Sequence, residues 1–266
     1  MGVENRNRKR FFIAFFCCLV SLSALAKDVQ VIEDELVECV KRINYWKTRP
    51  ADMDENFRIL DSLYIENIRL KGLLLDYSVS VPTTLTYAFD SLRAYINIAS
   101  SDDQKLRIYS WWLGEMDDME YFFNVFQYEA GGKVYSTLIN YDDGYDPKGY
   151  YSKIHSVAIG QDTTVYMGYF HAFYSPKDFS DSFQTFCIEG TQLHDSIPIF
   201  QTGDSLLSSL EVLYHPLSHK NYKKELILYQ AKEKQIKLRD TDQDGMVLRR
   251  HKKFVFNGKL FKEQID

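Results

Sequence analysis

The spacing of apolar residues changes near residue 95, and each spacing predicts a different kind of secondary structure. Before that point, apolar residues recur at steps of three and four. The first such set is Ile32, Leu36, Cys39, Val40 and Ile43. This period places all of them on one face of a helix that runs from about residue 27 to residue 46.

Two further helices are expected before residue 95. Pro50 interrupts the first helix, and Asp52 or Asp54 can cap the second. Pro82 then opens a third, shorter helix. The expected apolar faces carry Phe57, Leu60, Tyr64 and Ile68 on the second helix, and Leu85, Phe89 and Leu92 on the third.

From residue 95 onward the apolar period falls to two, which is typical of strands with one buried face. Ile96 and Ile98, for example, lie on either side of Asn97. Turn residues such as Gly131-Gly132 and Asp244-Gly245 separate most of the alternating runs, which predicts a large antiparallel β-meander. The further runs are 106–110, 119–129, 133–141, 151–159, 163–173, 182–189, 193–200, 224–230, 234–239, 246–251 and 252–256.

We therefore expect an α+β protein, with a helical segment over residues 27–94 and an antiparallel β-meander domain over residues 95–266. A flat open sheet rarely holds so many strands, so the sheet should curl, close or split. We favour a propeller-like or strongly curled sheet, with a barrel and a sandwich as alternatives. No repeat motif marks the blades of a propeller.

The first 26 residues carry a different pattern. Basic residues from Arg6 to Arg10 precede an apolar run over 11–20, and Ala24-Leu25-Ala26 forms a small-residue cleavage site before Lys27. This order predicts a secretory signal peptide over residues 1–26. The apolar run is shorter than the roughly 20 residues of a membrane-spanning helix. We expect a periplasmic or secreted protein with no transmembrane span after cleavage.

Cleavage makes the chain more acidic. It removes four basic residues and Glu4, so the net charge moves from −5 to about −8. A protein of this charge, without a basic patch, is a poor partner for nucleic acid.

Two cysteines remain after cleavage, Cys39 in the first helix and Cys187 in a strand. An oxidising compartment permits a disulfide between them. A free, buried thiol at each position explains the sequence equally well.

The segment Asp240-Thr241-Asp242-Gln243-Asp244-Gly245 matches the opening half of a calcium loop, in which Asp240, Asp242 and Asp244 would supply oxygen ligands. The closing half does not match, because His251 stands where a bidentate Glu is expected. The flanking residues also resemble strands rather than helices. A β-hairpin whose turn is set by Asp244-Gly245 is the alternative, and Ca²⁺ is the one cofactor that the sequence raises.

Trp111 and Trp112 are the candidate ligand-binding residues. Aromatic rings stack on sugars, and the carboxylates that follow, Glu115, Asp117, Asp118 and Glu120, are of the kind that hydrolyse glycosides. Adjacent residues of a strand point to opposite faces, so one Trp should face the core.

Familiar motifs of nucleophilic catalysis are absent from the sequence. It contains no G-x-S-x-G, P-loop or H-E-x-x-H motif. Triads can nevertheless assemble from distant positions, so an unfamiliar active site stays open.

Two blocks of the sequence resemble uncharacterised secreted proteins of Bacteroidota-type bacteria. They are the run from Ser100 to Trp111 and the closing run from Phe254 to Phe261, with a looser likeness over 175–193. A Gly commonly stands in those proteins where this chain has Gln104. The resemblance implies an envelope protein with a β-rich body, and it transfers no catalytic residues.

Together these features predict a non-catalytic binding or interaction module of the cell envelope, whose partner is a glycan or an envelope protein. One alternative is a glycan hydrolase that uses carboxylates between Trp111 and Glu120. The other is a structural protein stabilised by calcium.

Overall fold

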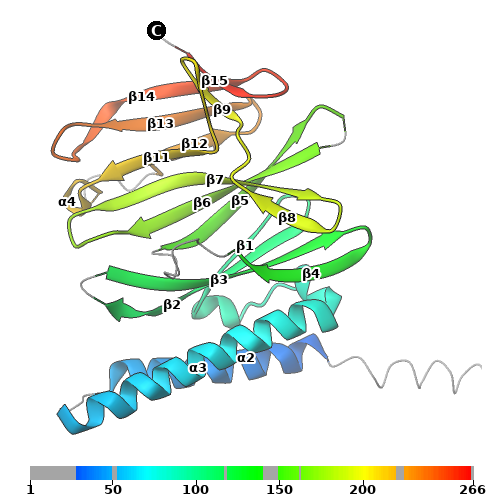
Figure 1. Ribbon diagram of the computed structural model, residues 1–266, viewed down its shortest axis with the longest axis vertical. Coiled ribbons are helices and arrows are strands. Elements are labelled where there is room, and N and C mark those ends of the chain that lie inside the picture. Colours follow the sequence, from blue (N-terminus) through cyan, green and yellow to red (C-terminus); the bar gives the residue numbers. More distant parts are fainter. Residues whose placement is uncertain are drawn as a thin grey trace, which may run out of the picture.

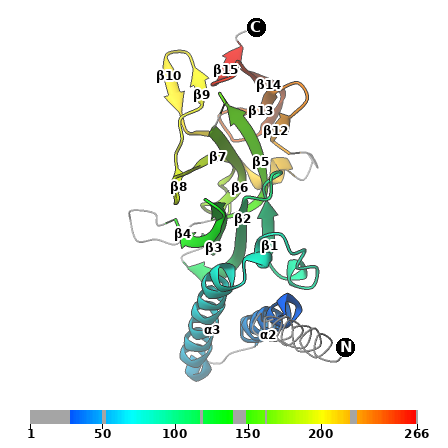
Figure 2. The same ribbon diagram turned by 90° about the vertical axis from the view of Figure 1, so that its right-hand side faces the viewer.

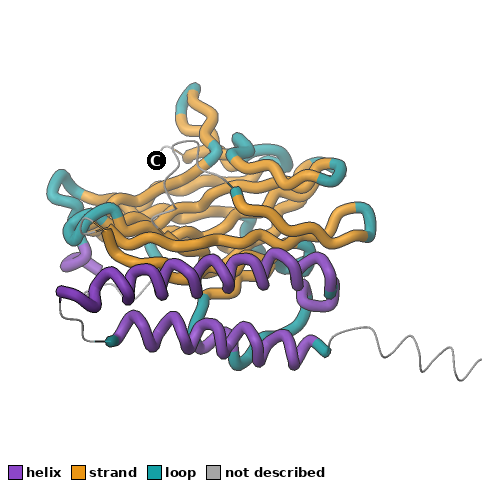
Figure 3. The backbone as a smooth tube through the Cα atoms, turned by 60° about the horizontal axis from the view of Figure 1, so that its bottom comes forward, coloured by secondary structure: helices purple, strands orange, loops and turns teal. Residues whose placement is uncertain are grey.

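The computed structural model describes residues 28–49, 53–116, 119–139, 149–161, 163–219 and 225–264. The expected signal peptide lies outside these residues, as do Asp117 and Asp118. Two long helices lie at one end of the molecule, and three β-sheets follow them in succession towards the other end (Figure 1). The two helices cover one side of the stacked strands (Figure 3).

Helix α2 (Val29–Thr48) has the apolar face that its sequence predicts. Ile32, Leu36, Cys39, Val40 and Ile43 are all buried. The side chain of Asp28 begins the helix by accepting a hydrogen bond from the backbone N–H of Gln30 at 3.1 Å. Helix α3 (Met53–Ser80) packs against α2 on one side and against the first sheet on the other.

The expected third helix is wrong. Its residues form two short 3₁₀ turns, η1 (Pro82–Leu85) and η2 (Leu92–Ala94). Phe89 lies between them with φ at 54°, a left-handed conformation that a continuous α-helix cannot contain. Glu33 of α2 fixes this connection, because its Oε1 accepts hydrogen bonds from the backbone N–H groups of Ser91 and Leu92.

The first sheet is an antiparallel meander in the order β1-β2-β3-β4. Its strands pair with their sequence neighbours, as the alternating pattern predicts. The strands are β1 (Asn97–Ser100), β2 (Leu106–Met116), β3 (Met119–Ala130) and β4 (Lys133–Leu138).

The second sheet has the strand order β11-β7-β6-β5, and β8 pairs with β7 outside that path. Every pair in it is antiparallel. The four-residue helix α4 (Pro216–His219) follows β11. The strands are β5 (Gly149–Ile159), β6 (Thr163–Phe173), β7 (Phe179–Glu189), β8 (Gln192–Asp195) and β11 (Ser209–Tyr214).

The third sheet has the strand order β10-β9-β15-β14-β13-β12. The pair of β15 and β9 is parallel, and the other pairs are antiparallel. The two runs expected at 246–251 and 252–256 form the single strand β14. The strands are β9 (Phe200–Thr202), β10 (Ser205–Leu207), β12 (Ile227–Gln230), β13 (Gln235–Thr241), β14 (Val247–Phe256) and β15 (Phe261–Gln264).

Three apolar clusters hold these layers together. The first joins the helices to the first sheet and includes Leu70 of α3 and Val125 of β3. The second joins the first and second sheets, where the rings of Phe126 and Phe186 lie 5.3 Å apart. The third joins the second and third sheets and includes Tyr169. The layers succeed one another along the long axis of the molecule (Figure 2).

The molecule is thus an α+β protein in which N-terminal helices precede antiparallel sheets. The described strands form three separate sheets, and neither a closed barrel nor a propeller is found among them. No helix within the described ranges is long and apolar enough to cross a membrane.

Candidate functional site

Three neighbouring strands of the second sheet bring together a serine, a histidine and an aspartate. His171 of β6 lies directly opposite Asp181 of β7 in the antiparallel register. Side chains of directly opposed residues share one face of a sheet. Strand β5, on the other side of β6, supplies Ser152.

A β-bulge determines where Ser152 points. The register between β5 and β6 shifts between Tyr151 and Lys153, and Ser152 is the extra residue. A bulge redirects a side chain that regular alternation would place elsewhere. Here the hydroxyl of Ser152 reaches the imidazole of His171, which lies opposite Tyr150 in the register.

Two hydrogen bonds connect the three side chains. Nδ1 of His171 lies 2.8 Å from Oδ1 of Asp181, and Nε2 of His171 lies 2.8 Å from Oγ of Ser152. When Nδ1 carries the proton, it donates to the carboxylate, and Nε2 is then free to accept the proton of the serine hydroxyl. Serine hydrolases connect their nucleophile, base and acid in the same order.

Asp181 is buried, and two phenols hold its carboxylate. The hydroxyl of Tyr169 donates to Oδ2 at 2.7 Å, and that of Tyr214 lies 3.5 Å from Oδ1. Burial, and secondly the charge of Asp181, raise the pKa of both phenols, so both remain protonated donors. The oxygen of Tyr169 also accepts the backbone N–H groups of Leu226 and Ile227, which ties the third sheet to the site.

Aromatic rings surround the imidazole. The ring of Tyr150 stacks on His171 with centroids 4.9 Å apart, and the ring of Tyr169 meets it edge-on at 4.8 Å. Phe173 continues the stack beyond Tyr150. The His171 side chain is still 24% exposed, whereas that of Asp181 is 3% exposed. The base therefore reaches solvent while the acid behind it does not.

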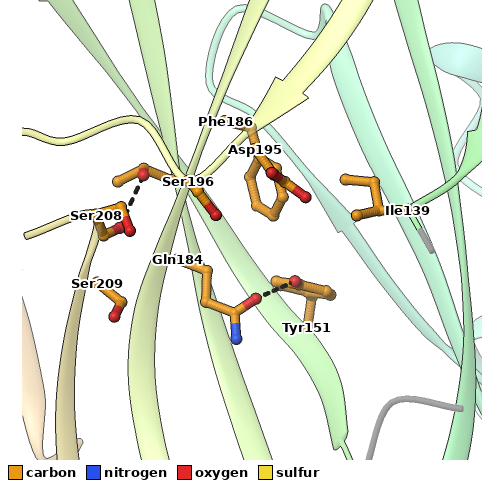
Figure 4. Close-up of a pocket in the computed structure, with 9 residues that line it drawn as sticks. Ile139, Tyr151, Gln184, Phe186, Asp195, Ser196, Ser208 and Ser209 are labelled. Carbon is orange, nitrogen blue, oxygen red and sulfur yellow. Dashed lines mark hydrogen bonds between the residues drawn. The ribbon is translucent and has the colours of Figure 1, made fainter. Parts of the chain in front are cut away.

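A cavity of about 180 Å³ opens on the other face of the second sheet (Figure 4). Tyr151 and Phe186, which line it, belong to the apolar cluster that faces the first sheet. Tyr169 belongs to the cluster that faces the third sheet. The cavity and the Ser152 site are therefore separated by the sheet itself.

The two tryptophans do not form a paired ligand surface. Trp111 is 3% exposed, and its Nε1 donates to Oδ1 of Asn67 at 2.9 Å, so Trp111 is the one of the two that faces the core, as the alternation along the strand predicts. Trp112 is half-buried, and Nζ of Lys47 lies 3.5 Å from its ring centroid. Of the carboxylates that follow, only Glu120 has a described side chain.

Asp240, Asp242 and Asp244 do not converge on a common point. Asp240 pairs with Arg250 at 2.6 Å, and Asp242 accepts the backbone N–H groups of Asp244 and Met246. Gly245 adopts φ of 72°, as the turn of a hairpin requires. Among the residues that the structure describes, no three His, Cys, Asp or Glu side chains are grouped so as to hold a metal ion. The segment therefore forms the hairpin turn that was expected as the alternative to a calcium loop.

Cys39 and Cys187 are free thiols, so the structure does not contain the disulfide that was considered between them. Cys39 is buried between the helices, with Sγ 3.6 Å from Oε2 of Glu66. Burial, and secondly the charge of Glu66, raise its pKa to about 11. Cys187 lies in the second sheet, and burial likewise raises its pKa.

Ser152, His171 and Asp181 were not identified as a group from the sequence. Ser152 and His171 are separated by 19 positions, and His171 and Asp181 by 10. No motif links residues at those separations, and the bulge at Ser152 is not visible in the alternation. Assigning the register of a hairpin between β6 and β7 would have placed His171 opposite Asp181. That pairing is the part of the site that sequence reasoning could have predicted.

Comparisons with protein-family models, with curated proteins and with solved structures found no match to this chain.

Proposed function

We propose that this protein is an exported, serine-dependent ester hydrolase whose nucleophile is Ser152. The observation that carries the proposal is the pair of 2.8 Å hydrogen bonds at His171, one to Ser152 and one to Asp181. A serine hydroxyl is a weak nucleophile unless a positioned base takes its proton, and the base in turn needs an orienting acceptor. All three parts are present on one face of the second sheet.

In the proposed reaction, Oγ of Ser152 attacks the carbonyl carbon of the ester while its proton passes to Nε2 of His171. The resulting imidazolium is stabilised by Asp181 and then protonates the departing alcohol. This leaves an acyl group on Ser152. Water, deprotonated by His171, attacks that acyl group, and the acid product leaves while the proton returns to Ser152.

The surroundings of His171 favour an uncharged acyl group. Tyr150 and Phe173 present aromatic rings next to the base, and desolvation raises the pKa of the Tyr150 phenol. An acetyl or short aliphatic ester fits such an apolar setting better than an anion does.

Export is the second part of the proposal. The order of basic, apolar and small residues over 1–26 supports it, and so does the resemblance of Ser100–Trp111 and Phe254–Phe261 to secreted Bacteroidota-type proteins. The Ser152 site favours an enzyme over the non-catalytic module that the sequence suggests. An envelope location would place the hydrolysed esters outside the inner membrane.

Hydrolysis of p-nitrophenyl acetate by the mature chain tests the catalytic part. We expect turnover above the buffer rate, and we expect Ser152→Ala to reduce it by a factor on the order of 10³. Ser156→Ala is the matched control, because Ser156 lies on the same strand and its buried Oγ has no hydrogen-bond partner among the described residues.

Equal turnover by the wild type and Ser152→Ala would contradict the proposal. So would a wild type that does not exceed the buffer rate with acetate, butyrate and octanoate esters. In either case the three side chains would serve only to tie the second and third sheets together through Tyr169.

A further inference from the structure

The cavity on the other face of the second sheet is lined by several polar side chains. It lies between β7, the segment that follows β8, and the start of β11 (Figure 4). The residues that line it are Ile139, Tyr151, Gln184, Thr185, Phe186, Asp195, Ser196, Ser208 and Ser209.

Gln184 presents hydrogen-bond donors to this cavity. Its Oε1 accepts the hydroxyl of Tyr151, which fixes the orientation of the amide. The Nε2 group consequently points away from Tyr151 (Figure 4), and Gln184 lines the cavity. Nε2 has two hydrogens to donate and no partner among the described residues.

Four more polar side chains face the same space. The hydroxyls of Ser196, Ser208 and Ser209 and the carboxylate of Asp195 make no hydrogen bond or ion pair within the described part of the chain. Ser196 is held there by a backbone φ of 57°, an uncommon conformation for a residue other than glycine. Each hydroxyl can both donate and accept, and Asp195 accepts only.

Phe186 and Tyr151 also line the cavity, but they are 2% and 1% exposed and belong to the apolar cluster between the first and second sheets. The exposed part of the lining is therefore mainly polar. Hydroxyl, amide and carboxylate groups in one small cavity match the hydroxyl groups at the edge of a sugar ring.

The charge of the cavity further restricts the class of ligand that it can bind. Asp195 is its one charged lining residue among those described, and no cation faces it. A carboxylate without a counter-ion repels an anionic ligand and accepts hydrogen bonds from a neutral one. We propose that this cavity binds one unit of a neutral saccharide.

This inference does not depend on the proposed hydrolase activity, because the two sites lie on opposite faces of the sheet. It also differs from the expectation that Trp111 and Trp112 bind a glycan, since neither residue lines the cavity.

Titration of ¹⁵N-labelled mature protein with glucose and with N-acetylglucosamine tests the inference by NMR. We expect the side-chain amide signals of Gln184 to shift saturably, with a dissociation constant of about 1 mM for at least one sugar. Gln184→Ala and Asp195→Asn should each weaken binding about fivefold or more, the effect of one lost hydrogen bond.

Two variants serve as controls. Gln201→Ala removes an amide whose hydrogen bond is to Gly203, and Asp204→Asn changes an exposed carboxylate in a neighbouring turn. Both should bind as the wild type does. Asp195 is exposed, so its variant decides the outcome if Gln184→Ala does not give a folded spectrum.

Three results would overturn the inference. The first is the absence of saturable shifts at Gln184 with either sugar up to 50 mM, a concentration that is about fifty times the expected dissociation constant. The second is tighter binding of glucuronic acid than of glucose, which would contradict the charge argument. The third is unchanged affinity in Asp195→Asn.

Discussion

The first sheet and the second sheet each bury a network of polar side chains, and the two networks differ in what their groups can do. In the first, Nη1 of Arg107 donates to the backbone carbonyls of Thr84 and Tyr87, both at 2.7 Å. Arg107 is 4% exposed. In the second, a hydroxyl, an imidazole and a carboxylate form a chain in which Ser152 and His171 are partly exposed and Asp181 is buried.

The difference lies in where each network ends. The groups of the first network are engaged by one another and by backbone atoms: Tyr109 donates to Gln127, and Gln127 donates to the carbonyl of Ser78 and to Thr84. This network fixes the connection between α3 and β1. The second network has one end in solvent, at a nucleophile and a base. Buried polar networks therefore separate into those that specify a fold and those that can also act on a ligand.

The largest effect is expected from Asp181→Asn. An amide turned to donate to Nδ1 of His171 stabilises the tautomer with the proton on Nε2, which cannot accept the proton of Ser152. Ester turnover should fall by a factor on the order of 10³. Asp178→Asn is the control, since among the described residues that carboxylate is bound by the Ser175 hydroxyl of its own turn, at 2.6 Å. Asp181→Asn turnover within tenfold of the wild type, in a folded protein, would remove Asp181 from the mechanism.

Arg107→Met should destabilise the fold without changing the turnover of the folded protein. The substitution removes the donor of the Tyr87 carbonyl and of the Ser100 hydroxyl. Among the described residues, the buried Thr84 carbonyl then keeps only the longer bond from the Tyr109 hydroxyl, at 3.4 Å. Unfolding in urea should show a loss of about 3 kcal/mol. Arg250→Met is the control, because Arg250 pairs with Asp240 at the surface and should cost about 0.5 kcal/mol or less. A loss at Arg107 no larger than at Arg250 would mean that the first network is not structural.

Trp111→Phe should have a smaller effect on stability. Phenylalanine cannot donate to Asn67, whose Oδ1 would lose its buried donor. We expect a loss of about 2 kcal/mol in urea unfolding. Trp112→Phe gives up a contact with Lys47 near the surface and should cost about 0.5 kcal/mol. A larger loss of stability in Trp112→Phe than in Trp111→Phe would contradict the assignment of Trp111 to the core and of Trp112 to a position near the surface.

The smallest effects are expected at the cysteines, in their rates of alkylation and in the pH dependence of stability. Iodoacetamide at pH 8 should modify Cys187 before Cys39, since Cys39 is fully buried and its pKa is raised to about 11 from 9.0. Between those values the unfolded thiol loses a proton that the folded one keeps, so stability should fall as the pH rises from 9 to 11. Cys39→Ala should remove that part of the decline. Unreduced protein that takes up no alkyl groups even when unfolded would instead indicate a disulfide.

The sequence predicted local structure better than assembly. The spacing from Ile32 to Ile43 identified the buried face of α2, because that face is set by a period within one element. The third helix was wrong because Glu33, a residue of another element, binds the backbone at Ser91 and Leu92. Nor could the alternation assign strands to three sheets, since that choice depends on contacts between distant residues.

The candidate site could not be predicted from the sequence either, because it also depends on contacts between distant residues. Ser152 joins His171 only through a bulge in β5, and Asp181 joins it only through the register of β6 and β7. Trp111 was a candidate for ligand binding because of its residue type, yet it is buried in the core, where it donates a hydrogen bond to Asn67. Residue type alone does not separate a ligand-binding ring from a core ring that needs one polar partner.

Covalent labelling with a fluorophosphonate tests the central claim most directly. Attack by Oγ of Ser152 on phosphorus forms an O–P bond and expels fluoride, while His171 takes the proton. Intact mass should show one adduct, peptide mapping should place it on Ser152, and both Ser152→Ala and heat-unfolded protein should remain unlabelled. An unlabelled native protein, or an adduct at any other serine, would contradict the account.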